Sequence, residues 1–277
     1  MRIEPSIELI CMDMDCTLFA GSETVPEINV RALRKCAEKG IHLALVSGRN
    51  YRFLMDKAAG IAPELSIVSG NGTRIDECVG GKCLMEKTFD REEALFVSRI
   101  LYGLDVYYED YTSRNNSAFR PERITPVHER SLARYLKNRQ ILGCEYPPSP
   151  ETASYEGVYK FVAFSDDPEK IARIQSVLDQ KGISHSSSAA DNVEIMPRGT
   201  DKGSALRFLI QYWKIERMRV MAFGDYTNDL SMLSEAGWPV AMENGVEELK
   251  RMARIIAPHH MDGGVGQVIE KYVLGEE

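Results

Sequence analysis

Two aspartates that are separated by one residue end an apolar segment near the start of the chain. Residues 9–12 are apolar and predict a buried strand, and Asp13 and Asp15 follow directly. Side chains at positions i and i+2 of an extended chain point to the same face, so both carboxylates can address one site. One aspartate can then attack a substrate while the other transfers a proton. The alternative interpretation is a loop of strand-end aspartates, some of which cap a helix.

Three further segments place polar residues where we expect strands to end or helices to begin. Residues 47–49 (Ser-Gly-Arg) follow one apolar run, and Asp225 follows another at 220–224. Lys202 stands between them at a predicted helix start, where a cation opposes the helix dipole. A locally unfavourable residue of this kind often marks a functional site. Clusters at the carboxyl ends of several strands are how open α/β sheets build their sites.

In this order, the four segments resemble the motifs of the haloacid dehalogenase (HAD) superfamily of phosphohydrolases. The family pattern is an Asp-x-Asp-x-Thr strand end, a Ser or Thr strand end, a Lys, and a Gly-Asp-x-x-x-Asp loop. This chain has Asp13-Met14-Asp15-Cys16-Thr17, then Ser47, then Lys202, then Gly224 through Asp229. The long segment between Ser47 and Lys202 resembles the C2-type cap of the Cof-like (type IIB) HAD phosphatases. Cys16 departs from the pattern, because the family usually has Gly there, and a side chain restricts the backbone angles of the loop.

The resemblance implies a role for most of the motif residues. Asp13 would be the nucleophile that forms an aspartyl-phosphate, and Asp15 would be the general acid and base. Mg²⁺, which prefers oxygen ligands, would be bound by the side chains of Asp13 and Asp225 and by the main-chain carbonyl of Asp15. The phosphate group of the substrate would be bound by four residues, which are Ser47, Gly48, Lys202 and Asn228.

Four other residues are candidates for supporting roles, namely Thr17, Arg49, Asn71 and Asp229. We expect Thr17 to order the loop between the two aspartates. Asp229 would hold a metal-bound water or pair with the motif lysine, unless it only benefits from the dipole of a helix first turn. Arg49 would reach the substrate or the cap, unless it is a surface charge. Asn71 would line the substrate pocket, unless it only forms the tight hairpin that Asn-Gly favours.

The order of the expected elements indicates an α/β fold with an insertion. Strands and helices alternate over residues 7–69 and again from residue 202, which predicts a doubly wound parallel sheet, the Rossmann-like HAD core. Residues 84–193 mix helices, one of them near residues 126–138, with less regular strands, as is typical of an α+β domain. We therefore predict a core domain of residues 1–83 and 194–277 and an inserted C2-type cap domain of residues 84–193. Thr24 and Glu27 have the spacing of a capping box at the first helix.

Composition narrows the class of protein. The 277 residues carry a formal net charge of -7 with a pI of about 5.4, which argues against nucleic-acid binding, since that usually needs a basic face. No long uncharged apolar stretch predicts a membrane-spanning helix, and the first residues lack the apolar core of a signal peptide. Six cysteines without Cys-x-x-Cys spacing fit a reducing cytoplasm. We expect a cytoplasmic enzyme whose partner is a small phosphorylated metabolite.

Three functions are compatible with these residues. The leading hypothesis is a Mg²⁺-dependent phosphatase that acts on small phosphorylated metabolites, with sugar phosphates as the expected class. A phosphomutase of the phosphomannomutase-like type would also use Asp13 and Asp15 but would return the phosphoryl group to its product. A catalytically idle binding protein, with the cap as a partner surface, is the third, and the complete set of motif residues argues against it.

Overall fold

The structure is a computed structural model that describes residues 6–21, 24–112, 116–125 and 144–276. The chain forms two compact units. One, here called the core, consists of Met1–Glu86 and Asp201–Glu277, and the other, here called the inserted unit, is Lys87–Thr200. These divisions fall later in the chain than those expected from the sequence at 83/84 and 193/194. Strand pairing explains both differences, because residues 83–86 pair within the core sheet and residues 192–196 pair within the inserted sheet.

The core contains an eight-stranded sheet in the order β14-β13-β12-β1-β2-β3-β4-β5. The strands from β14 to β3 are parallel to their neighbours, and β4 and β5 add an antiparallel edge. The strand bounds are β1 Leu9–Asp13, β2 His42–Val46, β3 Ser66–Ser69, β4 Arg74–Asp76, β5 Cys83–Glu86, β12 Val220–Gly224, β13 Trp238–Met242 and β14 Ile255–Ala257. This is the doubly wound sheet that the sequence predicts.

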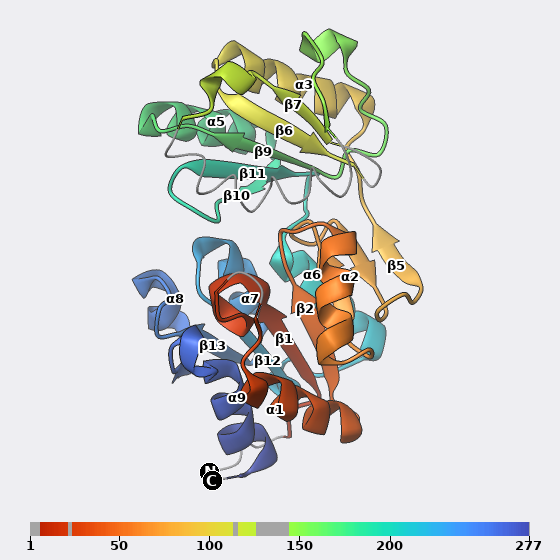
Figure 1. The fold of residues 1–277 in the computed structure, drawn as a ribbon, viewed down its shortest axis with the longest axis vertical. Helices are drawn as coiled ribbons and strands as arrows, with labels where there is room; N and C mark the ends of the chain where they lie inside the picture. Colours follow the sequence, from red (N-terminus) through yellow and green to blue (C-terminus); the bar gives the residue numbers. More distant parts are fainter. Residues whose placement is uncertain (1–5, 22–23, 113–115, 126–143, 277) are drawn as a thin grey trace. The chain divides into compact units, whose positions relative to one another are not determined.

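Helices cover both faces of this sheet (Figure 1). One face packs against α1 Glu27–Glu38, α2 Tyr51–Ile61, α9 Gly264–Val268 and the following turn η7 Ile269–Leu274. The other face packs against α6 Lys202–Trp213, α7 Leu230–Glu235 and α8 Glu247–Met252. Strands buried on both faces are apolar throughout rather than alternating, which is why the sequence shows them as continuous apolar runs.

The first helix shows how the sequence positions these elements. Its buried residues Asn29, Ala32, Leu33 and Cys36 recur at the spacing of one helical face. The predicted capping box at Thr24 is wrong. The helix begins after Pro26, none of the described side chains caps it, and Thr24 instead forms an isolated β-bridge with Ala20.

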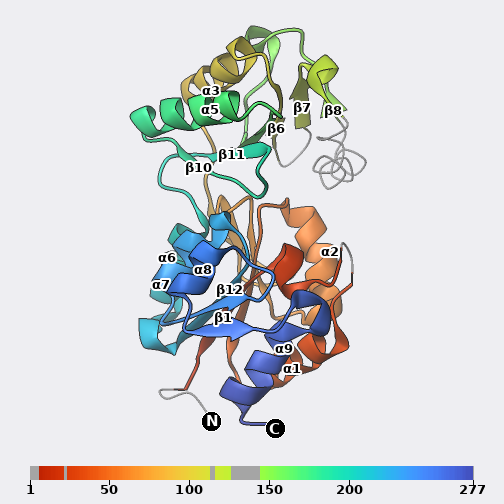
Figure 2. The ribbon, with the colours of Figure 1, turned by 90° about the vertical axis from the view of Figure 1, so that its left-hand side faces the viewer.

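The inserted unit contains a six-stranded sheet in the order β10-β11-β9-β6-β7-β8, antiparallel except for the β7–β8 pair. Helices α3 Arg91–Gly103 and α5 Pro168–Lys181 pack on one of its faces (Figure 2). The helix expected near residues 126–138 lies outside the described residues. The strand bounds are β6 Tyr107–Tyr111, β7 Asn116–Phe119, β8 Cys144–Glu145, β9 Lys160–Phe164, β10 Ser184–Ser186 and β11 Asn192–Met196.

Candidate active site

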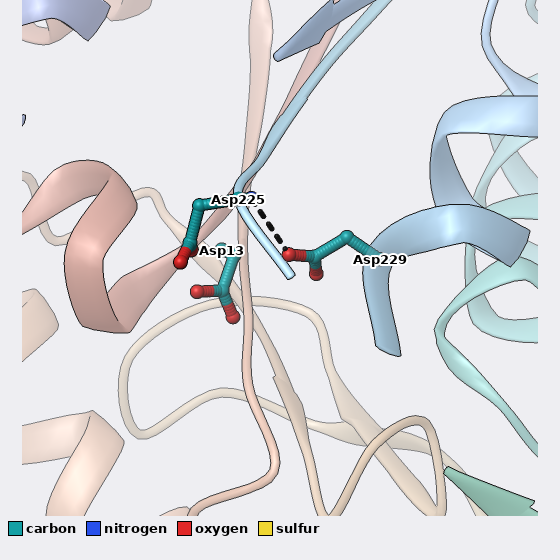
Figure 3. A group of neighbouring side chains, drawn as sticks. All are labelled: Asp13, Asp225 and Asp229. Atoms are coloured by element: carbon teal, nitrogen blue, oxygen red, sulfur yellow. Dashed lines mark hydrogen bonds between the residues drawn. The ribbon is translucent and has the colours of Figure 1, made fainter. Parts of the chain in front are cut away.

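The motif residues meet at the carboxyl edge of the core sheet. Strand β1 ends at Asp13, whose register partner on β2 is Val46, so Ser47 follows immediately beside it. On the other side Met12 pairs with Phe223 of β12, and Asp225 follows the end of that strand. Because the strands are parallel, their carboxyl ends share one edge. The carboxylates of Asp13, Asp225 and Asp229 gather there (Figure 3).

Lys202 supplies a buried positive charge to this group. It is the first residue of α6, and Asp201 caps the helix by accepting from the main-chain N–H of Ser204. The Lys202 Nζ atom lies 2.5 Å from Asp13 Oδ1 and 2.6 Å from Asp229 Oδ1, with only 1% of the lysine side chain exposed. Burial alone lowers the pKa of Lys202, but the charges of the two aspartates outweigh it and raise that pKa above its usual range. The amine therefore remains a cation.

Asp13 experiences the excess of negative charge in the cluster. Burial raises its pKa well above the usual range, Lys202 opposes that shift, and the charges of Asp229, Asp225 and Asp15 add to it. Asp13 is buried, with 7% of the residue's surface exposed to solvent. One lysine does not balance the carboxylates of Asp13, Asp225 and Asp229, so a further cation would lower the energy of the ionised nucleophile.

The side chain of Asp229 fixes the loop after β12 through hydrogen bonds to its main chain. Its Oδ1 accepts from Lys202, and its Oδ2 accepts from the main-chain N–H groups of Asp225 and Tyr226, at 3.0 and 3.2 Å. A Cβ atom on Gly224 would lie 2.5 Å from the Asp229 Cβ atom, so only glycine permits this close approach. With both oxygens engaged and no exposed surface, Asp229 orients the loop that carries Asp225.

Thr17 links the loop after β1 to Asp225. Its hydroxyl, which is fully buried, donates to Asp225 Oδ1 at 2.8 Å. Burial raises the pKa of Asp225 to about 7, the charge of Asp229 adds to the shift, and the Thr17 hydrogen bond opposes it. The sequence predicted that Thr17 orders the loop, and the structure gives the partner, which lies 208 positions away.

The residues present fit a divalent metal ion. One oxygen from each of Asp13, Asp225 and Asp229 lies within 4.8 Å of the others. A set of carboxylate oxygens suits hard cations such as Mg²⁺ rather than soft ones. Since both oxygens of Asp229 already accept hydrogen bonds, Asp13 and Asp225 are the better side-chain ligands of the three.

Arg49 holds the second aspartate of the first motif. Its Nε atom lies 2.8 Å from Asp15 Oδ2 and its Nη2 atom lies 2.7 Å from Asp15 Oδ1. This is the bidentate geometry of a strong ion pair between arginine and a carboxylate. The guanidinium also stacks over the ring of Phe53 at 4.5 Å from the centroid. Arg49 is 9% exposed. It is therefore not the surface charge that one interpretation of the sequence allowed.

The other predicted residues lie at or next to the same edge. Ser47 is buried, and its Oγ atom accepts from the Arg49 main-chain N–H, while Gly48 lies between them. Asn228 is half-buried in the turn η5 Thr227–Asp229. The turn that contains Asn71 joins β3 to β4 as a hairpin, and the Asn71 N–H donates to the Ser47 carbonyl at 3.0 Å.

Three residues that contact the loop after β1 were not predicted from the sequence, namely Asn29, Asn244 and His260. Asn29 carried a readable signal, since it is polar at a position on the apolar face of α1. Asn244 and His260 carried none, because neither belongs to a spaced motif and each reaches the loop from more than 200 positions away.

Comparison with known proteins identifies the family. The sequence model of the family of haloacid dehalogenase-like hydrolases matches residues 10–269 of this chain. The chain belongs to the haloacid dehalogenase-like hydrolases. The match runs through both units, so the resemblance drawn from four short motifs holds over nearly the whole HAD chain, including the insertion.

Two relatives of this HAD protein carry the names of phosphatases. It is 25% identical to the 5-amino-6-(5-phospho-D-ribitylamino)uracil phosphatase YwtE of Bacillus subtilis, over 98% of this chain and 99% of that one. It is 27% identical to the HMP-PP phosphatase of Yersinia pseudotuberculosis, over 88% of this chain and 86% of that one. Family and relatives together identify it as a phosphatase-type enzyme of the superfamily.

A solved structure shows the same fold. A haloacid dehalogenase-like hydrolase from B. subtilis superposes with a TM-score of 0.83 at 24% identity, covering 95% of this chain and 99% of that one. Within the described residues, no helix has the length and apolarity needed to cross a membrane.

Proposed function

We propose that this HAD protein is a Mg²⁺-dependent phosphatase that hydrolyses small phosphorylated metabolites through an aspartyl-phosphate on Asp13. The observation that carries the proposal is the buried contact of the Lys202 ammonium with Asp13. A nucleophilic carboxylate must be ionised, and a cation at 2.5 Å favours that form. The same cation is suited to bind the phosphate oxygens that approach Asp13.

In the first half-reaction Asp13 attacks the phosphorus atom and the bond from phosphorus to the leaving oxygen breaks. Asp15 donates a proton to that oxygen, so the leaving group departs as an alcohol. In the second half-reaction Asp15 accepts a proton from water, the water oxygen attacks phosphorus, and the bond to Asp13 breaks. Inorganic phosphate leaves, and both aspartates return to their starting states.

The remaining motif residues bind the phosphoryl group while it moves between oxygens. The Ser47 hydroxyl, the Gly48 N–H, the Lys202 ammonium and the Asn228 amide are the donors proposed for its oxygens. Mg²⁺, bound by the side chains of Asp13 and Asp225 and the main-chain carbonyl of Asp15, would supply charge neutralisation at the phosphate. Thr17 and Asp229 hold Asp225 and its loop for that purpose.

The relatives, rather than the core, support our proposal for the substrate class. The names of the two phosphatases above give 5-amino-6-(5-phospho-D-ribitylamino)uracil and HMP-PP as their substrates. We extend this class to the present chain and expect sugar or sugar-alcohol phosphates among its substrates. We also propose that the inserted unit acts as the cap that selects the leaving group.

Phosphate release from p-nitrophenyl phosphate and a panel of sugar phosphates tests this function. Wild type and Asp13→Asn are compared with Mg²⁺ and with EDTA. Release that requires both Mg²⁺ and Asp13 supports the phosphatase. Transfer between sugar positions without free phosphate would point to a mutase, and folded protein that turns over no ester would contradict the proposal.

A further inference from the structure

Three side chains from distant parts of the core donate to carbonyls of one short segment. This segment, residues 14–19, is here called the catalytic loop because Asp15 lies in it. Asn244 Nδ2 donates to the Cys16 carbonyl at 2.8 Å, and Asn29 Nδ2 donates to the Leu18 carbonyl at 2.9 Å. His260 Nδ1 lies 2.7 Å from the Phe19 carbonyl. A carbonyl only accepts, so His260 carries its proton on Nδ1.

The donors are themselves fixed in orientation. Asn244 Oδ1 accepts from the His260 main-chain N–H at 3.1 Å, and Asn29 Oδ1 accepts from the Gly266 N–H at 2.7 Å. The oxygen of each amide therefore accepts a hydrogen bond from the segment after β14, and its nitrogen donates one to the catalytic loop. This arrangement connects the catalytic loop to the turn η6 His260–Asp262 and to helix α9, which are remote from it in sequence.

The catalytic loop needs such support because of Cys16. Its φ is 59°, in the left-handed region that favours glycine. The neighbouring Asp15 is extended, with φ -74° and ψ 128°. The backbone therefore changes from an extended to a left-handed conformation between Asp15 and Cys16. A side chain at position 16 makes this conformation strained, and the Asn244 hydrogen bond holds the carbonyl of that same residue.

We propose that Asn244 is a positioning residue for the general acid and base Asp15, acting through the strained backbone at Cys16. The proposal rests on the phosphatase function proposed above. Arg49 holds the carboxylate of Asp15, and Asn244 holds the backbone that carries it. Without the Asn244 amide, Cys16 relaxes toward an ordinary conformation and Asp15 moves away from the leaving oxygen.

This role has a chemical signature that a general loss of structure lacks. Protonation by Asp15 matters most for leaving groups that are unstable as anions, and least for p-nitrophenolate. For a series of aryl phosphates, kcat/KM reports the transfer of the phosphoryl group to Asp13. We expect Asn244→Ala to lower kcat/KM for phenyl phosphate on the order of tenfold to a hundredfold, and for p-nitrophenyl phosphate far less.

The experiment combines this series with hydrogen exchange of the catalytic loop. Asn244→Ala is compared with the double variant Cys16→Gly/Asn244→Ala, in which glycine adopts the left-handed conformation without strain. Asn244→Asp keeps the acceptor for His260 but lacks the donor for Cys16. Gln267→Ala is the matched control, since it removes an exposed amide-to-carbonyl bond that does not involve the loop.

The proposal predicts faster exchange in residues 14–19 and a steeper leaving-group dependence for Asn244→Ala and Asn244→Asp, and recovery of both in the double variant. An equal loss of kcat/KM for every leaving group, or unchanged exchange in the loop, would overturn it. If wild type hydrolyses no aryl phosphate, the phosphatase proposal fails separately. The exchange measurement then still decides whether Asn244 restrains the loop.

Discussion

The ammonium group of Lys202 lies 2.5 Å from the carboxylate of Asp13, although the two residues are 189 positions apart in sequence. Neither side chain tolerates this depth of burial alone, because an unpaired charge in the interior is costly. The pair therefore joins β1 and α6 of the core electrostatically. The residues that contact this pair are those whose substitution should lower activity, stability or both.

Replacing Lys202 with methionine keeps most of the side-chain volume and removes the charge. We expect Lys202→Met to abolish measurable phosphatase activity and to lower the free energy of unfolding by about 3–5 kcal/mol, because Asp13 and Asp229 lose their common cation. Urea unfolding at several pH values checks this. The loss should shrink at acid pH, where the carboxylates take up protons. Lys250→Met, at an exposed i,i+3 pair, is the control and should change little; equal stability of the two variants would contradict the argument.

Metal binding should depend on pH through Asp225. Its raised pKa of about 7 in the metal-free protein means that it holds a proton below neutrality, and a cation must displace that proton. Stabilisation by Mg²⁺, about 2.7 kcal/mol at a hundredfold excess over Kd, should therefore weaken as pH falls from 8 to 6. Thermal unfolding with Mg²⁺ and with EDTA measures it. Asp225→Asn should remove the Mg²⁺ effect, whereas exposed Asp56→Asn should retain it.

Arg49→Lys keeps a positive charge but loses the planar fork that contacts both oxygens of Asp15. We expect kcat/KM for a sugar phosphate to fall on the order of tenfold to a hundredfold, because Asp15 is no longer held in one orientation. KM should change less than kcat. Phe53→Leu, which removes the ring over which the guanidinium stacks but keeps an apolar core side chain, should produce a smaller loss. A variant Arg49→Lys with unaltered kcat would show that the ion pair does not orient Asp15.

The inserted unit should lose stability as pH rises. Burial raises the pKa of Asp110 on β6 to about 7, although the N–H of Ser117 donates to it. The folded state thus retains a proton on Asp110 that the unfolded chain releases near pH 4. The free energy of unfolding therefore falls between about pH 4 and pH 7, by at most about 1.4 kcal/mol per pH unit for this group.

Asp110→Asn removes the titrating proton and keeps an oxygen that can accept from Ser117. Relative to wild type, we expect it to be more stable at pH 8 and about equal at pH 5. Urea unfolding at both values checks the prediction, with exposed Glu156→Gln as the control. A variant that is less stable than wild type at pH 8 would contradict the assignment of a buried, proton-binding carboxyl group.

The fold was predictable because its signals are local. Apolar runs that end in polar residues marked β1, β2 and β12, and the helix start expected at Lys202 is where α6 begins. Parallel strands bring their carboxyl ends to one edge, so the meeting of the motif residues followed from topology alone. The failure at Thr24 is also local, since Pro26 fixes the helix start without a side-chain cap.

The pairing of side chains within the site was harder to predict. Whether Arg49 faces solvent or Asp15 depends on its rotamer and on the ring of Phe53. The contact of Thr17 with Asp225 and that of Asn244 with Cys16 join segments more than 200 positions apart, with no shared periodicity. Such contacts depend on how the sheet aligns the strand ends, which no local pattern in the sequence specifies.

The most direct test of the account is whether Asp13 carries the phosphoryl group. In Asp15→Asn the second half-reaction lacks its base, while p-nitrophenyl phosphate needs little help from an acid in the first. Rapid mixing with this ester and Mg²⁺ should therefore release a burst of about one p-nitrophenolate per active site and leave a phosphorylated protein whose label maps to Asp13. Adding Asp13→Asn should remove both the burst and the label. A burst and phosphate release that persist without the Asp13 carboxylate would contradict the central claim.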